Sequence, residues 1–225
     1  MVVIKLVEVK KEMKRMMLIF GLVLTMAILS ACGSGGSKDE HENHKNHEQH
    51  NSESKETSQS LDWDVQSFSF KDQNEAEFGL EDLKGKVWMA NFIFTNCTTV
   101  CPPMTAHMAK LQGMAKEEKV DVKFVSFSID PKRDNADALK KFGENYDADF
   151  SNWHFLGGYE EKQIEQLARD SFKTPVVADP NSDQFIHASA FFLVDKEGKV
   201  VSRYDGVENT PYEEIIADMK NRLKK

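Results

Sequence analysis

Two periodicities of apolar residues run along the chain from residue 61 onward, one typical of strands and the other of helices. Alternating or continuous apolar runs predict strands at Trp63–Phe70, Val87–Phe94, Val122–Ile129, Trp153–Leu156, Ser189–Val194 and Lys199–Tyr204. Apolar residues spaced three and four apart predict helices at Pro102–Glu118, from the N-cap Asp134 past Phe142, at Glu160–Phe172 and from Pro211 to about Leu223. Strands that alternate with helices predict an α/β fold with a central mixed sheet flanked by helices.

The last two predicted strands flank Asp195-Lys196-Glu197-Gly198, which is typical of a hairpin turn with Gly198 at a positive φ. Residues 61–225 are numerous enough for one domain with a hydrophobic core, and they contain no internal repeat. The order of strands and helices, closed by the hairpin and a last helix, matches a thioredoxin-like sandwich. We therefore predict one thioredoxin-like domain over residues 61–225.

A basic segment leads into an apolar one near the start of the chain. The apolar stretch Met16–Ala31 is shorter than the roughly 20 residues that a membrane-spanning helix needs. It ends in Leu-Ser-Ala-Cys and resembles a bacterial lipoprotein signal peptide. This implies that residues 1–31 are removed, that Cys32 is lipidated, and that the protein is anchored at the outer face of the bacterial cytoplasmic membrane. An uncleaved anchor and a chance match are the alternatives, and translation starts at Met1 or Met13.

Residues 32–60 follow as a polar segment. They contain no aromatic residue and almost no aliphatic one, so we predict a disordered tether. Four histidines recur at every third position, either as part of a solvated spacer or as a weak site for copper, zinc or nickel, namely His41, His44, His47 and His50. Removal of residues 1–31 takes away five of 29 basic and two of 37 acidic residues, which leaves a net charge of −11. Such an acidic protein is not expected to bind nucleic acid or anionic lipid headgroups.

Cys97 and Cys101 are the only thiols of the predicted domain, and they stand in NFIFTNCTTVCPP between a predicted strand and a predicted helix. Pro102 and Pro103 suit the first turn of that helix, where a missing N–H costs nothing. The positive end of the helix dipole favours a thiolate over a thiol. The pair is therefore suited to redox exchange or to binding a soft metal.

Three segments carry a resemblance to a known family: NFIFTNCTTVCPPMTAHM, SFSIDPKRDNADALKKFGENYDADFSNWHFLGG and FIHASAFFLVDKEGKVVSRYDG. In order and spacing they are similar to the Sco (SenC) family of copper-binding assembly proteins, over about residues 62–224. The resemblance implies that Cys97, Cys101 and His187 bind copper and that the two cysteines form a redox disulfide. It also implies an assembly factor, not an enzyme, for the binuclear copper centre of cytochrome c oxidase, with the copper-bearing oxidase subunit as partner; we expect a monomer.

The chemistry of the side chains agrees with this resemblance. Thiolates select Cu(I), and an added imidazole makes a site that also holds Cu(II). Two sulfurs and one nitrogen leave a structural zinc site one ligand short. His107 and His154 match no family ligand and are predicted to be structural, while Met104 and Met108 are predicted to belong to the core. Asp130 either orients a ligand or partner or caps a turn.

Two other functions remain open. The competing function is a thiol–disulfide reductase that keeps the cysteines of the oxidase subunit reduced, and a third is a binding module with a merely structural disulfide. Thioredoxin-type enzymes have two residues between their cysteines, whereas three separate Cys97 from Cys101, which changes the reduction potential. The spacing from Thr98 to Cys101 faintly resembles that of peroxiredoxins, but Phe94 stands where their motif has proline.

The lipoprotein prediction is tested by Cys32→Ala. Two acyl chains at about 0.8 kcal/mol per buried CH₂ hold a protein stably, whereas one chain is marginal. We expect Cys32→Ala to accumulate as an unprocessed precursor without incorporated lipid label, while the control Cys97→Ala is processed and labelled normally. Maturation of Cys32→Ala to a chain that starts at residue 32 would contradict the prediction.

Overall fold

The computed structural model describes residues 61–224. The predicted signal peptide and tether lie outside the described residues, together with Cys32, His41, His44, His47 and His50. Within the described range, no helix is long and apolar enough to cross a membrane.

A six-stranded mixed sheet forms the centre of the described domain, in the order β1-β10-β9-β4-β5-β6. Its strands are β1 (Trp63–Asp64), β4 (Val87–Ile93), β5 (Val122–Ser128), β6 (Trp153–Leu156), β9 (Ala190–Val194) and β10 (Lys199–Asp205). β4 pairs in parallel with β5, and β5 with β6, while β9 runs antiparallel to both β4 and β10. The predicted mixed sheet is confirmed.

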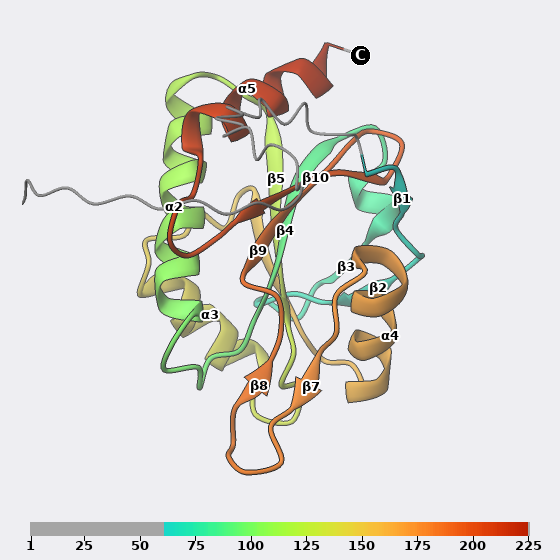
Figure 1. The fold of residues 1–225 in the computed structure, drawn as a ribbon, viewed down its shortest axis with the longest axis vertical. Coiled ribbons are helices and arrows are strands. Elements are labelled where there is room, and N and C mark those ends of the chain that lie inside the picture. Colours follow the sequence, from blue (N-terminus) through green and yellow to red (C-terminus); the bar gives the residue numbers. More distant parts are fainter. Residues whose placement is uncertain (1–60, 225) are drawn as a thin grey trace, which may run out of the picture. The chain divides into compact units, whose positions relative to one another are not determined.

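Helices cover both faces of this sheet, and Figure 1 shows α2 and α4 on opposite sides of it. The helical elements are η1 (Leu80–Leu83), α2 (Cys101–Glu117), α3 (Ala136–Glu144), α4 (Glu161–Phe172) and α5 (Tyr212–Leu223). α5 packs against α2 and β4, and α3 packs against β6. The hairpin prediction also holds, since Gly198 has φ 79° between β9 and β10.

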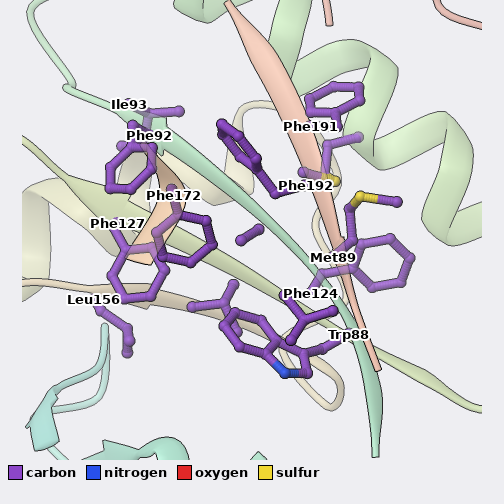
Figure 2. Close-up of a cluster of buried hydrophobic side chains, with 14 of the residues drawn as sticks. Trp88, Met89, Phe92, Ile93, Phe124, Phe127, Leu156, Phe172, Phe191 and Phe192 are labelled. Carbon is purple, nitrogen blue, oxygen red and sulfur yellow. The ribbon is translucent and has the colours of Figure 1, made fainter. Parts of the chain in front are cut away.

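An aromatic cluster fixes α4 to the sheet (Figure 2). The Phe92 ring on β4 lies 5.5 Å from that of Phe127 on β5 and 5.3 Å from that of Phe172 on α4. Phe172 also lies 5.2 Å from Phe192 on β9. Such ring pairs contribute roughly 0.5–1.5 kcal/mol each beyond the burial of their area. All seven residues of β4 are buried, so the end of this strand is a fixed point for the loop that follows.

The predicted strand Trp63–Phe70 is wrong as one element. The chain leaves the sheet edge after β1, where the N–H of Gln66 donates to Ser171 Oγ on α4 at 3.0 Å. Ser69–Lys71 then forms β2, which pairs with β3 (Glu77–Gly79) in a separate hairpin. Buried apolar residues continue across this break at Val65, Phe68 and Phe70, but their spacing changes from two to three between Val65 and Phe68, where the chain leaves the sheet.

The predicted N-cap of α3 is also wrong by one residue. Asn135 is the N-cap, and its side-chain oxygen accepts the N–H of Ala138 at 2.9 Å. Asp134 is buried instead and accepts hydrogen bonds from the backbone and hydroxyl of Thr95 at 3.1 and 2.6 Å and from Ser128 Oγ at 2.6 Å. Burial raises the pKa of the Asp134 carboxyl, and the hydrogen bonds from Ser128 and Thr95 oppose that rise.

These two neighbouring residues are expected to differ strongly on truncation. Asp134→Ala leaves donors on half-buried Thr95 and buried Ser128 without an acceptor, so we expect it to lower the free energy of unfolding by about 3 kcal/mol. Asn135→Ala removes only the helix cap and is expected to cost about 1 kcal/mol. Equilibrium urea unfolding of the two purified variants measures both, and equal losses would contradict the assignment of Asp134 as a loop anchor.

Candidate metal centre

Cys97 lies in the loop that joins β4 to α2, and Cys101 lies at the end of that loop. The N–H of Cys97 donates to the carbonyl of Phe94 at 3.2 Å, which turns the chain directly after β4. Cys101 is the first residue of α2, followed by two prolines at the start of the helix, and its N–H donates to Cys97 Sγ at 3.3 Å. Cys101 is fully buried, and Cys97 is 7% exposed. The Cys97 sulfur therefore receives an N–H from the positive end of the helix.

The two thiols hold different protonation states. The hydrogen bond from the Cys101 thiol and those from the N–H groups of Cys101 and Thr99 outweigh burial and lower the pKa of Cys97 to about 3. The hydrogen bond to Cys97, burial, and the charges of Cys97 and Asp134 raise the pKa of Cys101. At neutral pH the pair is thus a Cys97 thiolate beside a Cys101 thiol, which keeps the single shared proton.

The His187 ring faces this pair from the segment that leads into β9. Its Nδ1 lies 3.0 Å from the carbonyl oxygen of Ala188, and because a carbonyl only accepts, Nδ1 carries the proton. Nε2 then carries a lone pair and no proton, and it accepts a hydrogen bond from Cys101 Sγ at 3.7 Å. The Phe94 ring meets the imidazole edge-on with centroids 6.1 Å apart. The imidazole is therefore fixed in the tautomer that binds a metal through Nε2.

The three side chains form a donor set of two sulfurs and one nitrogen. Metal–thiolate and metal–imidazole bonds of about 2.3 and 2.0 Å at a near-tetrahedral angle separate sulfur from nitrogen by roughly 3.6 Å. The observed 3.7 Å between Cys101 Sγ and His187 Nε2 fits this separation. Residues 61–224 contain no group of three His, Cys, Asp or Glu side chains that is already arranged as a complete metal site. Binding of a metal by both sulfurs would require the Cys101 thiol to lose its proton.

The structure confirms the structural assignment of the other candidates. His107 Nδ1 lies 3.0 Å from both the Gly206 carbonyl oxygen and Thr210 Oγ1. His154 Nδ1 lies 3.2 Å from Asp72 Oδ2, and its ring stacks on Phe78. Met104 and Met108 are completely buried in the core.

Asp130 caps a turn, and its side chain pairs with Arg133. Its backbone carbonyl accepts the N–H groups of Arg133 and Asp134 at 3.1 and 3.0 Å, and its carboxylate accepts Arg133 Nε. The role of Asp134 was not predicted from the sequence. Its carboxylate accepts a hydrogen bond from Thr95, which lies in the loop that contains Cys97. The available signal was its position just past β5, at the same edge of the parallel sheet as the cysteines.

Comparison with known proteins identifies relatives of this chain. The SCO1/SenC family model matches residues 56–224. The SCO1 protein homolog of Bacillus subtilis is 44% identical over 206 residues, which cover 92% of this chain and 97% of that protein. The crystal structure of a SCO1/SenC family lipoprotein from Bacillus anthracis has a TM-score of 0.71 and 53% identity, covering 72% of this chain and 96% of that one.

Two further structures carry functional descriptions of their own. BsSco, described as having a disulfide switch and as a member of the Sco family of cytochrome c oxidase assembly proteins, has a TM-score of 0.69 and 51% identity over 73% of this chain and 96% of its own. Copper-bound ScoI of Bradyrhizobium japonicum has a TM-score of 0.58 and 25% identity over 71% of this chain and 99% of its own. The described domain has the thioredoxin-like fold of these structures, and the chain belongs to the SCO1/SenC family.

Proposed function

We propose that the protein is an extracytoplasmic copper-binding assembly factor that delivers copper, as cargo, to the binuclear copper centre of cytochrome c oxidase. The observation that carries the proposal is the His187 imidazole, whose Nε2 lone pair faces Cys101 Sγ at 3.7 Å while Nδ1 is bound to a carbonyl. Thiol exchange alone has no need of a third ligand in this position. The copper-bound ScoI structure and the oxidase-assembly description of BsSco support the choice of metal and partner.

The donor set suits copper in both oxidation states. Thiolates from Cys97 and Cys101 favour Cu(I), and the imidazole of His187 adds the nitrogen that Cu(II) prefers. Cys97 is already a thiolate at neutral pH, whereas the raised pKa of Cys101 keeps its proton in place. Copper binding therefore displaces that one proton, and binding weakens as the pH falls because protons compete for the Cys101 sulfur.

The same proposal places the domain at the outer face of the cytoplasmic membrane through a lipid on Cys32, with the copper-bearing oxidase subunit as its partner. The description of the Bacillus anthracis relative as a lipoprotein supports this attachment. In this arrangement, residues 32–60 serve as the tether. Their histidines either belong to a solvated spacer or form a weak metal-binding site.

A thiol–disulfide reductase is the second candidate, and the unequal thiols favour it. The Cys97 thiolate would attack one sulfur of a substrate disulfide and expel the other as a thiolate, forming a mixed disulfide. Cys101, after losing its proton, would then attack Cys97 Sγ and release the second substrate thiol, which leaves Cys97–Cys101 oxidised and the substrate reduced by two electrons. The greater exposure of Cys97 suits the first attack.

Copper binding is tested by titrating the reduced protein with a Cu(II) salt. We expect one tightly bound ion with a thiolate charge-transfer band, and about one proton released per ion at pH 7, because only Cys101 must be deprotonated. The band should be absent in Cys97→Ala and Cys101→Ala. His187→Ala should bind Cu(II) at least tenfold more weakly, a loss of roughly 1.4 kcal/mol of binding free energy. The control His107→Ala should bind Cu(II) like the parent. Full affinity in the disulfide form of a protein lacking residues 33–60 would refute the proposal.

The two candidate functions are separated by His187→Ala, because both of them require the cysteines. We expect cells carrying this variant to lose oxidase activity and to regain part of it in excess copper. The purified variant should still reduce a disulfide substrate at near the parent rate, since exchange uses only the sulfurs. A fully active oxidase in His187→Ala cells at limiting copper would contradict copper delivery and favour the reductase function.

A further inference from the structure

The segment that carries His187 is weakly held by its own secondary structure. It follows β7 (Val177–Ala178) and β8 (Phe185–Ile186), two strands of two residues that pair only with each other. A two-stranded hairpin is marginally stable in water by itself. Figure 1 shows this hairpin projecting from the end of the domain at which β4 leads into α2. The position of His187 over the sulfurs therefore depends on contacts from outside the hairpin.

One carboxylate in the hairpin loop supplies such contacts. Asp183 Oδ2 accepts Asn96 Nδ2 at 2.8 Å and Arg133 Nη1 at 3.2 Å, and its backbone oxygen accepts Arg133 Nη2 at 2.6 Å. The next residue, Gln184, returns a bond from Nε2 to the backbone oxygen of Asn96 at 3.3 Å. Asn96 directly precedes Cys97, so these bonds join the His187 segment to the cysteine loop. We call Asp183, Gln184, Asn96 and Arg133 the Asp183 clamp.

Arg133 of the Asp183 clamp is itself held by a buried carboxylate. Arg133 lies in the loop between β5 and α3, where its Nε donates to the carboxylate of Asp130, which is almost completely buried. The cysteine loop is held separately, because Asp134 binds the backbone and hydroxyl of Thr95. Loss of Asp183 should therefore release the hairpin and leave the two sulfurs in place.

We propose that Asp183 is a positioning residue that holds His187 against the Cys97–Cys101 pair and thereby sets the affinity for Cu(II). The inference rests on the proposed copper-binding function. Asp183 lies four residues before His187, a length that reaches about 13 Å when extended, so a freed loop can move Nε2 far more than its 3.7 Å separation from Cys101 Sγ. The nitrogen ligand would then be lost from part of the population, while capture of Cu(I) by the two thiolates would continue.

Two features limit the size of the effect. The Arg133 and Asp183 side chains are 39% and 64% exposed, and solvent weakens an ion pair of this kind. The Phe185 ring also packs edge-on against Phe94 at 5.2 Å, and this contact stays in any variant of Asp183. We therefore expect Asp183→Ala to weaken Cu(II) binding about tenfold rather than to abolish it.

The experiment uses the full chain in a background in which His41, His44, His47 and His50 are replaced by Gln, so that only the dithiol site takes metal. Asp183→Ala should bind Cu(II) about tenfold more weakly, with a spectrum shifted toward that of His187→Ala, and its Cu(I) affinity should stay within about twofold. Asp183→Asn keeps an oxygen for Asn96 and Arg133 and should recover part of the loss. The double variant Arg133→Ala/Asp183→Ala should lose less Cu(II)-binding free energy than the sum of the losses in the two single variants.

Asp179→Ala is the matched control from the same loop. The Asp179 carboxylate accepts the N–H of Asn181 at 2.9 Å and Ser182 Oγ at 2.7 Å, both within the loop, and it contacts neither Asn96 nor Arg133 in the described residues. We expect parental Cu(II) affinity and spectrum for this variant. Equal losses of Cu(II) affinity in Asp179→Ala and Asp183→Ala would mean that any damage to the hairpin loop has the same effect. That result would overturn the proposed role of Asp183.

A second measurement needs no copper. Amide hydrogen exchange of residues 184–188 in the metal-free protein should be faster in Asp183→Ala than in the parent or in Asp179→Ala. If the parent binds no copper, the proposed function fails and the role of Asp183 in copper affinity fails with it, whereas exchange still shows whether Asp183 holds the hairpin. Unchanged exchange together with unchanged Cu(II) affinity in Asp183→Ala would overturn the proposal outright.

Discussion

The antiparallel pairing of β4 with β9 is the constraint on which the site depends. Ala90 lies opposite Phe192 and Trp88 opposite Val194, so the end of β4 meets the beginning of β9. The cysteine loop leaves the sheet where the His187 segment enters it, although 86 residues separate Cys101 from His187. The aromatic cluster around Phe92 makes this pairing rigid. A change of register between these strands would separate the sulfurs from the imidazole.

One shared proton links the two candidate functions. The same hydrogen bond that makes Cys97 a thiolate keeps the proton on Cys101. For a metal, this arrangement offers one ready ligand and one that must first lose its proton. For disulfide exchange, it offers one nucleophile and one resolving thiol that stays inactive until the first step is complete. The cysteine geometry is therefore compatible with both chemistries, and the imidazole is the feature that favours metal.

Much of the fold follows from local pattern. The five strands of the central sheet from Val87 onward and three of the four α-helices agree with their predicted bounds to within one residue, because apolar periodicity and burial coincide there. The short strands β7 and β8 were not predicted, since two residues carry no periodic pattern. The prediction of one strand at Trp63–Phe70 fails because the apolar pattern shifts by one residue between Val65 and Phe68, where the chain changes from one sheet to another. The family resemblance placed His187 correctly beside the dithiol. The hydrogen bond between Asn96 and Asp183 could not be predicted, because the two residues are 87 positions apart and neither belongs to an apolar periodic pattern.

The burial of the three proposed ligand side chains is graded, since Cys101 is inaccessible, Cys97 is slightly exposed and His187 is half-buried. A metal held by all three would be open to the surroundings on the imidazole side alone. An incoming donor atom from another protein would displace the nitrogen first and the Cys101 sulfur last. Transfer would then proceed through intermediates of fixed order, in which the cargo is never without ligands and never loose in solution. Under the proposed function, the gradient of burial would thus give the transfer of copper a direction.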